Sequence, residues 1–147
     1  MISERLIGYI EQSIRQNWDI EALSNYKEKG YSYKEIASRI LKIHLFFKEA
    51  GIHEGDKIGL VGRNSAHWCM IYLATVTYGA VIVPILPDFK PEDLANLISH
   101  SDSKILFIDD KIFESLDATK LPEITGVFSL EDFSVITAGN AMVKEAF

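Results

Sequence analysis

Apolar side chains recur at a helical spacing near the start of the chain. Leu6, Ile10, Ile14 and Trp18 lie four positions apart, and residues with charges of both signs lie between them. This pattern predicts an amphipathic surface helix over residues 1–20. Such a helix can also rest on a membrane surface, but its polar face mixes Glu with Arg and is not rich in lysine. Peripheral membrane contact therefore stays open as an alternative.

Residues 22–33 contain two short extended runs on either side of a polar turn, a pattern typical of a β-hairpin. Ser32 and Glu35 then match the S-x-x-E capping box, in which each side chain satisfies a free N–H at the start of a helix. The sequence therefore predicts a helix from Tyr33 to Glu49.

Strands and helices alternate after residue 50. The apolar runs and the segments between them predict, in chain order, strand 57–62, helix 65–78, strand 81–86, a helix that begins near Pro91, and strand 104–108. This alternation predicts an α/β fold, with a mostly parallel sheet whose strands are joined by crossover helices.

The pattern weakens beyond Asp110. A short helix is predicted near residues 112–116 and an extended run at 127–130. We therefore expect a single α/β unit with its core over residues 34–130, and we expect residues 131–147 to be a terminal segment cut from the next element.

Residues 64–87 contain no Asp, Glu, Lys or Arg and are long enough to span a bilayer. Gly79, the β-branched run at 81–83, Pro84 and Pro87 interrupt the stretch and argue against a span. A buried helix followed by a buried strand is the favoured interpretation. The helix is apolar nearly all round, so it requires cover on nearly every side.

The composition narrows the choice of partner and compartment. With 15 basic and 21 acidic residues, the chain has a formal net charge of −6 and no concentrated basic face, which argues against nucleic acid as a partner. Cys69 is the single cysteine and cannot form a disulfide within the chain. The first residues lack the uninterrupted apolar core of a secretory signal. We therefore expect a cytoplasmic protein, with attachment to a membrane surface as the alternative.

Gly59 and Gly62 raise the question of nucleotide binding, because glycine-containing turns between a strand and a helix often hold phosphates. A dinucleotide fingerprint needs G-x-G-x-x-G and an acidic residue at the end of the next strand. The chain has only the two glycines, and its next strand ends in Pro-Ile-Leu-Pro. A tight turn with close packing is the favoured interpretation, and no cofactor-binding residue is assigned.

Two other groups of residues carry chemistry-bearing side chains. Asp109 and Asp110 follow a strand and could hold magnesium, although capping of the helix near Ile112 is the favoured interpretation. The run 99–102 reads Ser-His-Ser-Asp, but triads assemble in space and not along consecutive residues, and His100 fits a favourable contact with a helix end. The remaining histidines show no metal-ligand spacing. No catalytic or metal-binding residue is assigned.

Six segments, in order along the chain, resemble the opening of the adenylate-forming enzymes. They are residues 31–36, 50–58, 64–68, 78–84, 91–94 and 101–107. The third segment, Asn-Ser-Ala-His-Trp, is similar to the Asn-x-x-x-Trp segment of the long-chain fatty-acid CoA ligase branch. The fourth is similar to the GAV-x-VP strand of the whole superfamily. The resemblance extends from about Ala22 to Ile108, and the ordered set is more specific than any single segment.

The resemblance implies an enzyme that activates a carboxylate with ATP and magnesium, giving an acyl-adenylate and pyrophosphate, and then transfers the acyl group to CoA. This sequence contains neither the Ser/Thr/Gly-rich phosphate loop ending in Gly-x-Pro-Lys nor the Tyr-x-x-Thr-Glu motif of that family. It also lacks the separate C-terminal domain with the catalytic lysine. What is implied is the N-terminal subdomain of a fatty-acid CoA ligase, inert by itself, with the remainder of the same polypeptide as its partner.

Arg63, Asn64 and His67 are the candidates for lining an acyl or nucleotide cleft, because they follow the end of a predicted strand. Helix capping and packing between subdomains is the competing interpretation. For the whole chain, the alternative function is a free-standing α/β binding or interaction domain without catalysis, which would use the apolar helix 65–78 as a partner surface.

Overall fold

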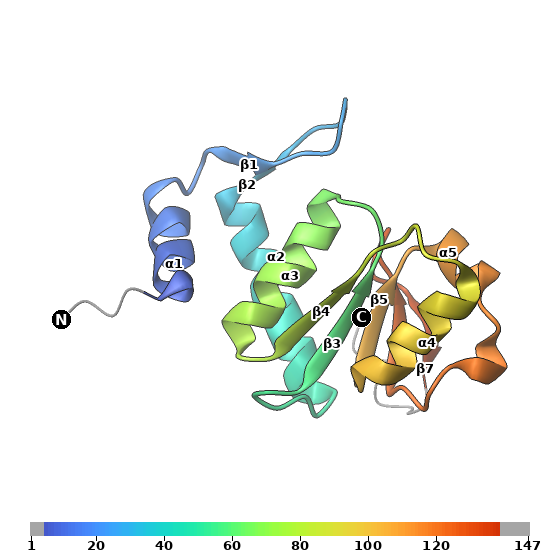
Figure 1. The fold of residues 1–147 in the computed structure, drawn as a ribbon. Coiled ribbons are helices and arrows are strands. Elements are labelled where there is room, and N and C mark those ends of the chain that lie inside the picture. Colours follow the sequence, from blue (N-terminus) through green and yellow to red (C-terminus); the bar gives the residue numbers. More distant parts are fainter. Residues whose placement is uncertain (1–4, 139–147) are drawn as a thin grey trace.

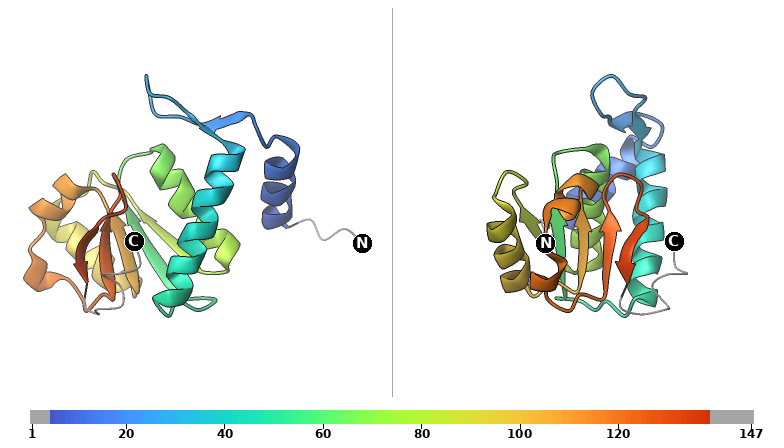
Figure 2. Two further views of the ribbon diagram at one scale, coloured as in Figure 1. Left: turned by 180° about the vertical axis from the view of Figure 1, so that it is seen from behind. Right: turned by 90° about the vertical axis from the view of Figure 1, so that its right-hand side faces the viewer.

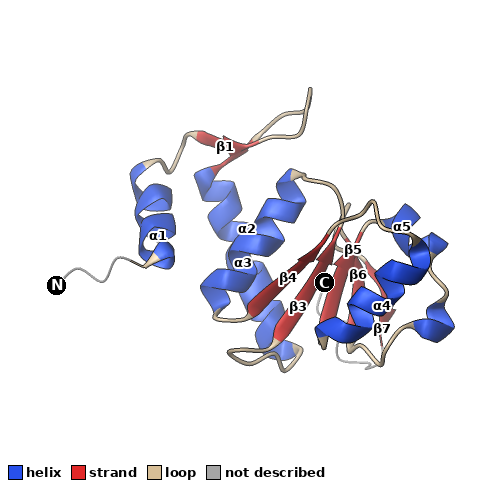
Figure 3. Cartoon of the chain, in the orientation of Figure 1, coloured by secondary structure: helices blue, strands red, loops and turns tan. Residues whose placement is uncertain are grey.

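The computed structural model describes residues 5–138, and Figure 1 shows their arrangement. A leading helix and a small hairpin precede a five-stranded sheet (Figure 3). The elements are α1 (Leu6–Gln16), β1 (Glu21–Leu23), β2 (Tyr31–Ser32), α2 (Tyr33–Glu49), β3 (Lys57–Val61), α3 (Ala66–Tyr78), β4 (Val81–Ile85), α4 (Pro91–Ser101), β5 (Ile105–Ile108), α5 (Asp110–Ser115), a 3₁₀ turn (Ala118–Lys120), β6 (Gly126–Ser129) and β7 (Val135–Ala138).

The main sheet has the strand order β4-β3-β5-β6-β7. The first four of these strands are parallel, and β7 is antiparallel to β6. The predicted α/β fold with a mostly parallel sheet and crossover helices is confirmed. β7 is not among the elements that the sequence predicts, so the sheet extends past residue 130, where the expected core ends. Residues 139–147, the end of the predicted terminal segment, lie outside the described residues.

The two faces of the sheet are covered by different helices. Ile58, Leu60 and Phe107 belong to the core that α2 and α3 cover. Leu106 and Ile108 belong to a second core, which α4 and α5 cover. Figure 2 shows α2 and α4 on opposite sides of the strands. Successive strand residues point to opposite faces, so the continuous apolar runs of the sequence supply both cores at once.

Helix α2 begins and ends at the predicted residues, and the capping box is formed. The Ser32 hydroxyl accepts the Glu35 N–H at 3.3 Å, and the Glu35 carboxylate accepts the Ser32 N–H at 2.8 Å. The bond from the Ser32 backbone, helped by the Ser32 hydroxyl, holds the pKa of Glu35 below its ordinary value. The first turn of α2 is therefore fixed by local chemistry.

Helix α3 packs beside α2 on one face of the sheet, and all its residues are buried or half-buried. Ser65 caps its start and Gly79, at φ 91°, ends it. Within the described residues, no helix is both long and apolar enough to cross a bilayer. The strand that follows is less buried than expected, because β4 is an edge strand with Val81 and Pro84 exposed. Proline is tolerated there because the outer edge of the strand needs no ladder hydrogen bond.

His44 joins α2 to α3. Its Nε2 lies 2.9 Å from the Ala74 carbonyl and 3.0 Å from the Thr77 hydroxyl, and its ring packs against Tyr78. A carbonyl only accepts, so Nε2 carries a proton and donates it. Burial lowers the pKa of His44. The neutral imidazole is therefore the form that stabilises the contact between the two helices.

Replacing the cap residue of α2 should destabilise the fold. We expect Ser32→Ala to lower the free energy of unfolding by about 1 kcal/mol, because the Glu35 N–H loses its acceptor at the helix start. Urea unfolding measures the difference. Ser38→Ala, an exposed position in the middle of the same helix, is the matched control and should leave stability unchanged or slightly raised. Equal losses in both variants would contradict the capping role.

The stability of the fold should also decrease as the pH is lowered, because of His44. Its pKa is lower in the folded state than in the unfolded chain, so the contribution of the neutral ring is complete above the unfolded pKa of about 6.5 and declines below it. Urea midpoints compared at about pH 7.5 and about pH 5 should differ in the native protein. His44→Gln should reduce the difference, whereas His100→Gln, at an exposed position in α4, should retain it.

Candidate functional site

A polar hollow of about 340 Å³ lies at the carboxyl edge of the parallel strands. The turns after β3, β5 and β6 meet there because parallel strands end at the same edge of a sheet. The hairpin between β1 and β2 closes one side. The lining residues are Asn25, Glu28, Tyr31, Arg63, Asn64, Ser65, His67, Asp109, Leu130 and Glu131.

All three cleft candidates from the sequence line this one hollow. Arg63 and Asn64 are exposed in the β3–α3 turn, and His67 is half-buried in the first turn of α3. A role for them in ligand binding stays a prediction. Their convergence is a consequence of the turn, which brings the end of β3 and the start of α3 to the same edge.

Close packing shapes the β3–α3 turn. A Cβ atom added at Gly62 would lie 2.5 Å from Cδ2 of Leu130, so a larger residue here would force the Leu130 side chain to move. Gly59 is similarly constrained, since its Cβ would lie 2.8 Å from Cδ1 of Leu106. Both glycines therefore lie in close contact with leucine side chains, as the packing interpretation expects. The first N–H of α3, on Ala66, donates to the Asn25 side chain at 2.9 Å, which attaches the hairpin to the helix.

His67 connects three segments of the hollow. Its Nδ1 lies 3.2 Å from the Leu130 carbonyl, so Nδ1 carries the proton and Nε2 is an acceptor. The Tyr31 hydroxyl lies 3.5 Å from Nε2, within reach to donate to it. The imidazole also packs on Phe133, with 4.6 Å between ring centroids. Phe133 has φ 66°, a backbone conformation that is uncommon for an aromatic residue.

The charged groups of the hollow are of both signs. Arg63 pairs with Asp88 at 3.2 Å, with both side chains about four-fifths exposed. An ion pair so open to water is weak, so the guanidinium can exchange partners. Glu28 and Glu131 also line the hollow and add two carboxylates to it. The hollow therefore combines one accessible cation with several acceptors.

Asp109 has the capping role that the sequence favours. Its carboxylate accepts the N–H groups of Lys111 at 3.0 Å and Ile112 at 3.4 Å, at the start of α5. One oxygen of Asp110 is buried without a hydrogen-bond partner in the described part of the chain. Between residues 5 and 138, no group of three or more His, Cys, Asp or Glu side chains is arranged to hold a metal ion. The Asp109 carboxylate is thus engaged at the start of α5.

Residues 99–102 form the C-terminal end of α4. The Ser101 hydroxyl donates to the Ile98 carbonyl at 2.7 Å, and Asp102 ends the helix in a left-handed conformation at φ 53°. Asp102 also pairs with Lys57 at 3.3 Å. Cys69 is half-buried, and burial raises the pKa of its thiol, so it is not an activated nucleophile.

More than half of the residues that line the hollow are not among the candidates that the sequence suggests. Tyr31 and Asn25 lie about forty positions before α3, and Leu130 lies 63 positions after His67. No local motif marks any of them. Only the topology, which brings the β6–β7 connection and the hairpin to the same sheet edge, places them beside His67.

Comparison with known proteins places the chain in a family. A model of the AMP-binding enzyme family matches residues 10–145. The chain is 26% identical over 120 residues to 4-hydroxybutyrate–CoA ligase 2 of Metallosphaera sedula, covering 82% of the chain and 22% of that protein. It is 28% identical over 124 residues to the acyl–CoA ligase YdaB of Bacillus subtilis, covering 84% of the chain and 24% of that ligase. The chain thus spans about a quarter of these relatives.

Solved structures share the fold. The anthranilate CoA ligase AuaEII with anthranoyl-AMP superimposes with a TM-score of 0.78 at 16% identity, over 86% of this chain and 25% of that one. The N-terminal subdomain of Klebsiella oxytoca NpsA gives a TM-score of 0.70 at 17% identity, over 97% of this chain and 32% of that one. At such identities these likenesses describe the fold alone. Because the family model matches nearly the whole chain, the protein belongs to the AMP-binding enzyme family and corresponds to the N-terminal part of its adenylate-forming members.

Proposed function

We propose that the chain is the N-terminal subdomain of an ATP-dependent acyl-CoA ligase, which activates a fatty acid through an acyl-adenylate. The observation that carries the proposal is the family match over residues 10–145. Several relatives are CoA ligases, and one is long chain acyl-CoA synthetase 5 of Arabidopsis thaliana, 29% identical over 69% of this chain and 15% of that protein. A hydroxybutyrate ligase and an anthranilate ligase are also similar to the chain. Activation of a carboxylic acid is therefore better supported than the choice of a fatty acid as that substrate.

In this proposal the chain supplies scaffold and one wall of a cleft. The polar hollow at the carboxyl edge is that wall, with His67 holding the β6–β7 connection in place through its bond to Leu130. Arg63, on the rim, is the group suited to a carboxylate or phosphate oxygen of the acyl or nucleotide ligand, because its present ion pair is weak. ATP, magnesium and CoA belong to the full enzyme, and the rest of the same polypeptide supplies the groups that hold them.

The chain by itself should be inert. We expect no release of pyrophosphate from ATP when the 147-residue chain is supplied with fatty acids, because the sequence has no phosphate loop. The longer polypeptide that contains these residues should exchange labelled pyrophosphate into ATP in the presence of its carboxylate, and a panel of chain lengths would identify that substrate. Pyrophosphate release by the chain alone would contradict the inert role. A stable chain with a specific partner, and no activity in any longer polypeptide, would support the free-standing binding domain instead.

Arg63 can be tested against its own ion pair. In the longer enzyme, we expect Arg63→Gln to raise KM for the carboxylate or ATP about tenfold, the loss expected for one charge-assisted hydrogen bond. Asp88→Asn is the matched control, because it breaks the same ion pair and leaves the guanidinium in place. It should leave KM unchanged. Equal effects of the two variants would mean that the ion pair, and not contact with a ligand, explains Arg63.

A further inference from the structure

Helix α1 is attached to the rest of the molecule almost without polar contacts. It has no buried residue, and Figure 1 shows it standing apart from the sheet. Its ion pair, Arg15 with Glu11 at 2.7 Å, is internal to the helix. Hydrogen bonds to α2 begin only after the helix ends, at the Trp18 and Ile20 carbonyls. Within the described residues, apolar contacts alone hold α1 in place.

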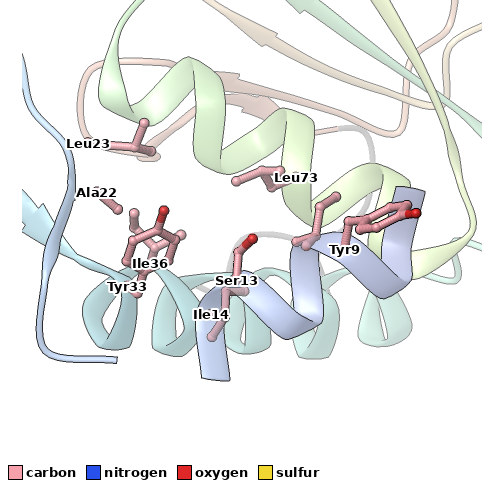
Figure 4. A pocket seen from close by; sticks show the side chains of 9 residues that line it. Tyr9, Ser13, Ile14, Ala22, Leu23, Tyr33, Ile36 and Leu73 are labelled. Carbon is pink, nitrogen blue, oxygen red and sulfur yellow. The ribbon is translucent and has the colours of Figure 1, made fainter. Parts of the chain in front are cut away.

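Two apolar hollows lie beneath α1. One, of about 280 Å³, is lined by residues of α1, the first strand, α2 and α3 (Figure 4). The other, of about 550 Å³, lies between α1 and α2 and reaches Thr77 in α3. The side chains of Ile10 and Ile14 border both. The contact between α1 and the body is therefore loosely packed, so the helix is held by far less than a packed core would supply.

Large apolar side chains remain exposed on this side of the molecule. On α1 and the segment after it they are Leu6, Ile7, Tyr9, Trp18 and Ile20. Leu41, which borders the larger hollow, and Leu45, one turn further along α2, are 60% and 55% exposed. These residues and the two hollows form what we term the α1–α2 face.

Basic and acidic residues are distributed unevenly along the chain. Residues 5–49, which include α1 and α2, carry eight Lys or Arg and six Asp or Glu. Residues 50–138 carry six Lys or Arg and thirteen Asp or Glu. Lys34, Lys42 and Lys48 are exposed on α2, at helical spacing with the two exposed leucines, and outnumber the exposed acidic residues of the helix, Glu35 and Glu49. Despite a net charge of −6, the α1–α2 face belongs to the basic part of the chain.

We propose that the α1–α2 face is a binding surface for an anionic lipid bilayer. The apolar side of α1 and the two α2 leucines enter the acyl boundary, and the α2 lysines contact the anionic headgroups. Trp18 lies two residues after the end of α1, and its amphipathic ring suits the headgroup level. The acidic remainder of the chain faces away from the membrane.

The loose attachment of α1 is what makes this binding feasible. No hydrogen bond or ion pair between α1 and α2 has to break in the described structure when the helix moves outward. The apolar contacts that are lost are replaced by contacts with lipid, which is equally apolar.

Vesicle binding tests the proposal independently of ligase activity. The 147-residue chain would be sedimented with vesicles of phosphatidylcholine alone and of phosphatidylcholine with phosphatidylglycerol. We expect binding to the anionic vesicles, weakened by salt. In a Trp68→Phe background, Trp18 is the one remaining tryptophan, and its emission should shift to the blue on binding.

Substitutions test whether vesicle binding uses the α1–α2 face. Leu41→Asp and Leu45→Asp, made as separate variants that each add one charge, should each lower the bound fraction about tenfold. Leu86→Asp, at a leucine 68% exposed in the loop after β4, is the matched control and should bind normally. Circular dichroism of each variant checks folding.

Three results would overturn the proposal. The first is no binding to anionic vesicles, and the second is binding that Leu86→Asp weakens as much as the α2 variants do. The third is self-association of the chain that the α2 variants abolish, with no vesicle binding, because the occupant would then be a second copy. If the longer ligase loses the binding that the chain shows, the face is covered by that polypeptide and the membrane proposal fails, while the proposed function stands.

Discussion

The structure depends on the burial of both faces of its parallel strands. β3 and β5 lie inside the sheet, and their side chains alternate between two cores. Each buried Leu, Ile or Phe side chain contributes about 1.5–3 kcal/mol relative to exposure, so neither face can be left in water. Phe107 packs with Phe47 and Phe128 on one face, and Leu106 packs beneath α4 on the other. Helices on both faces, joined by crossover connections, follow from this requirement.

The same arrangement produces the polar hollow. Parallel strands end together, so the turns that follow β3, β5 and β6 gather at one edge and expose their backbone groups and side chains there. His67 stabilises the assembly because one nitrogen donates to Leu130 while the other faces Tyr31. The hollow is thus a product of sheet topology.

Helix α1 is held to the molecule by weaker contacts than the helices of the core. α2 and α3 are held by buried side chains and by the His44 contact, whereas α1 has only apolar contacts across loosely packed space. Stability is therefore uneven along the chain, and elements with few buried contacts are the ones that move most easily. The excess of acidic residues after residue 50 gives the two parts different electrostatic character.

The sequence by itself determined the local elements. The Ser32–Glu35 box, the cap at Ser65 and Gly79 delimit α2 and α3, since caps and left-handed positions depend on neighbouring residues. Apolar runs likewise marked β3, β4 and β5. The tertiary structure alone decided the rest. β7 is a short strand without a strong pattern and forms by pairing with β6, and β4 is only partly buried because it lies at the sheet edge. The hollow joins Tyr31, His67 and Leu130 across long separations, which only the packing of the chain specifies.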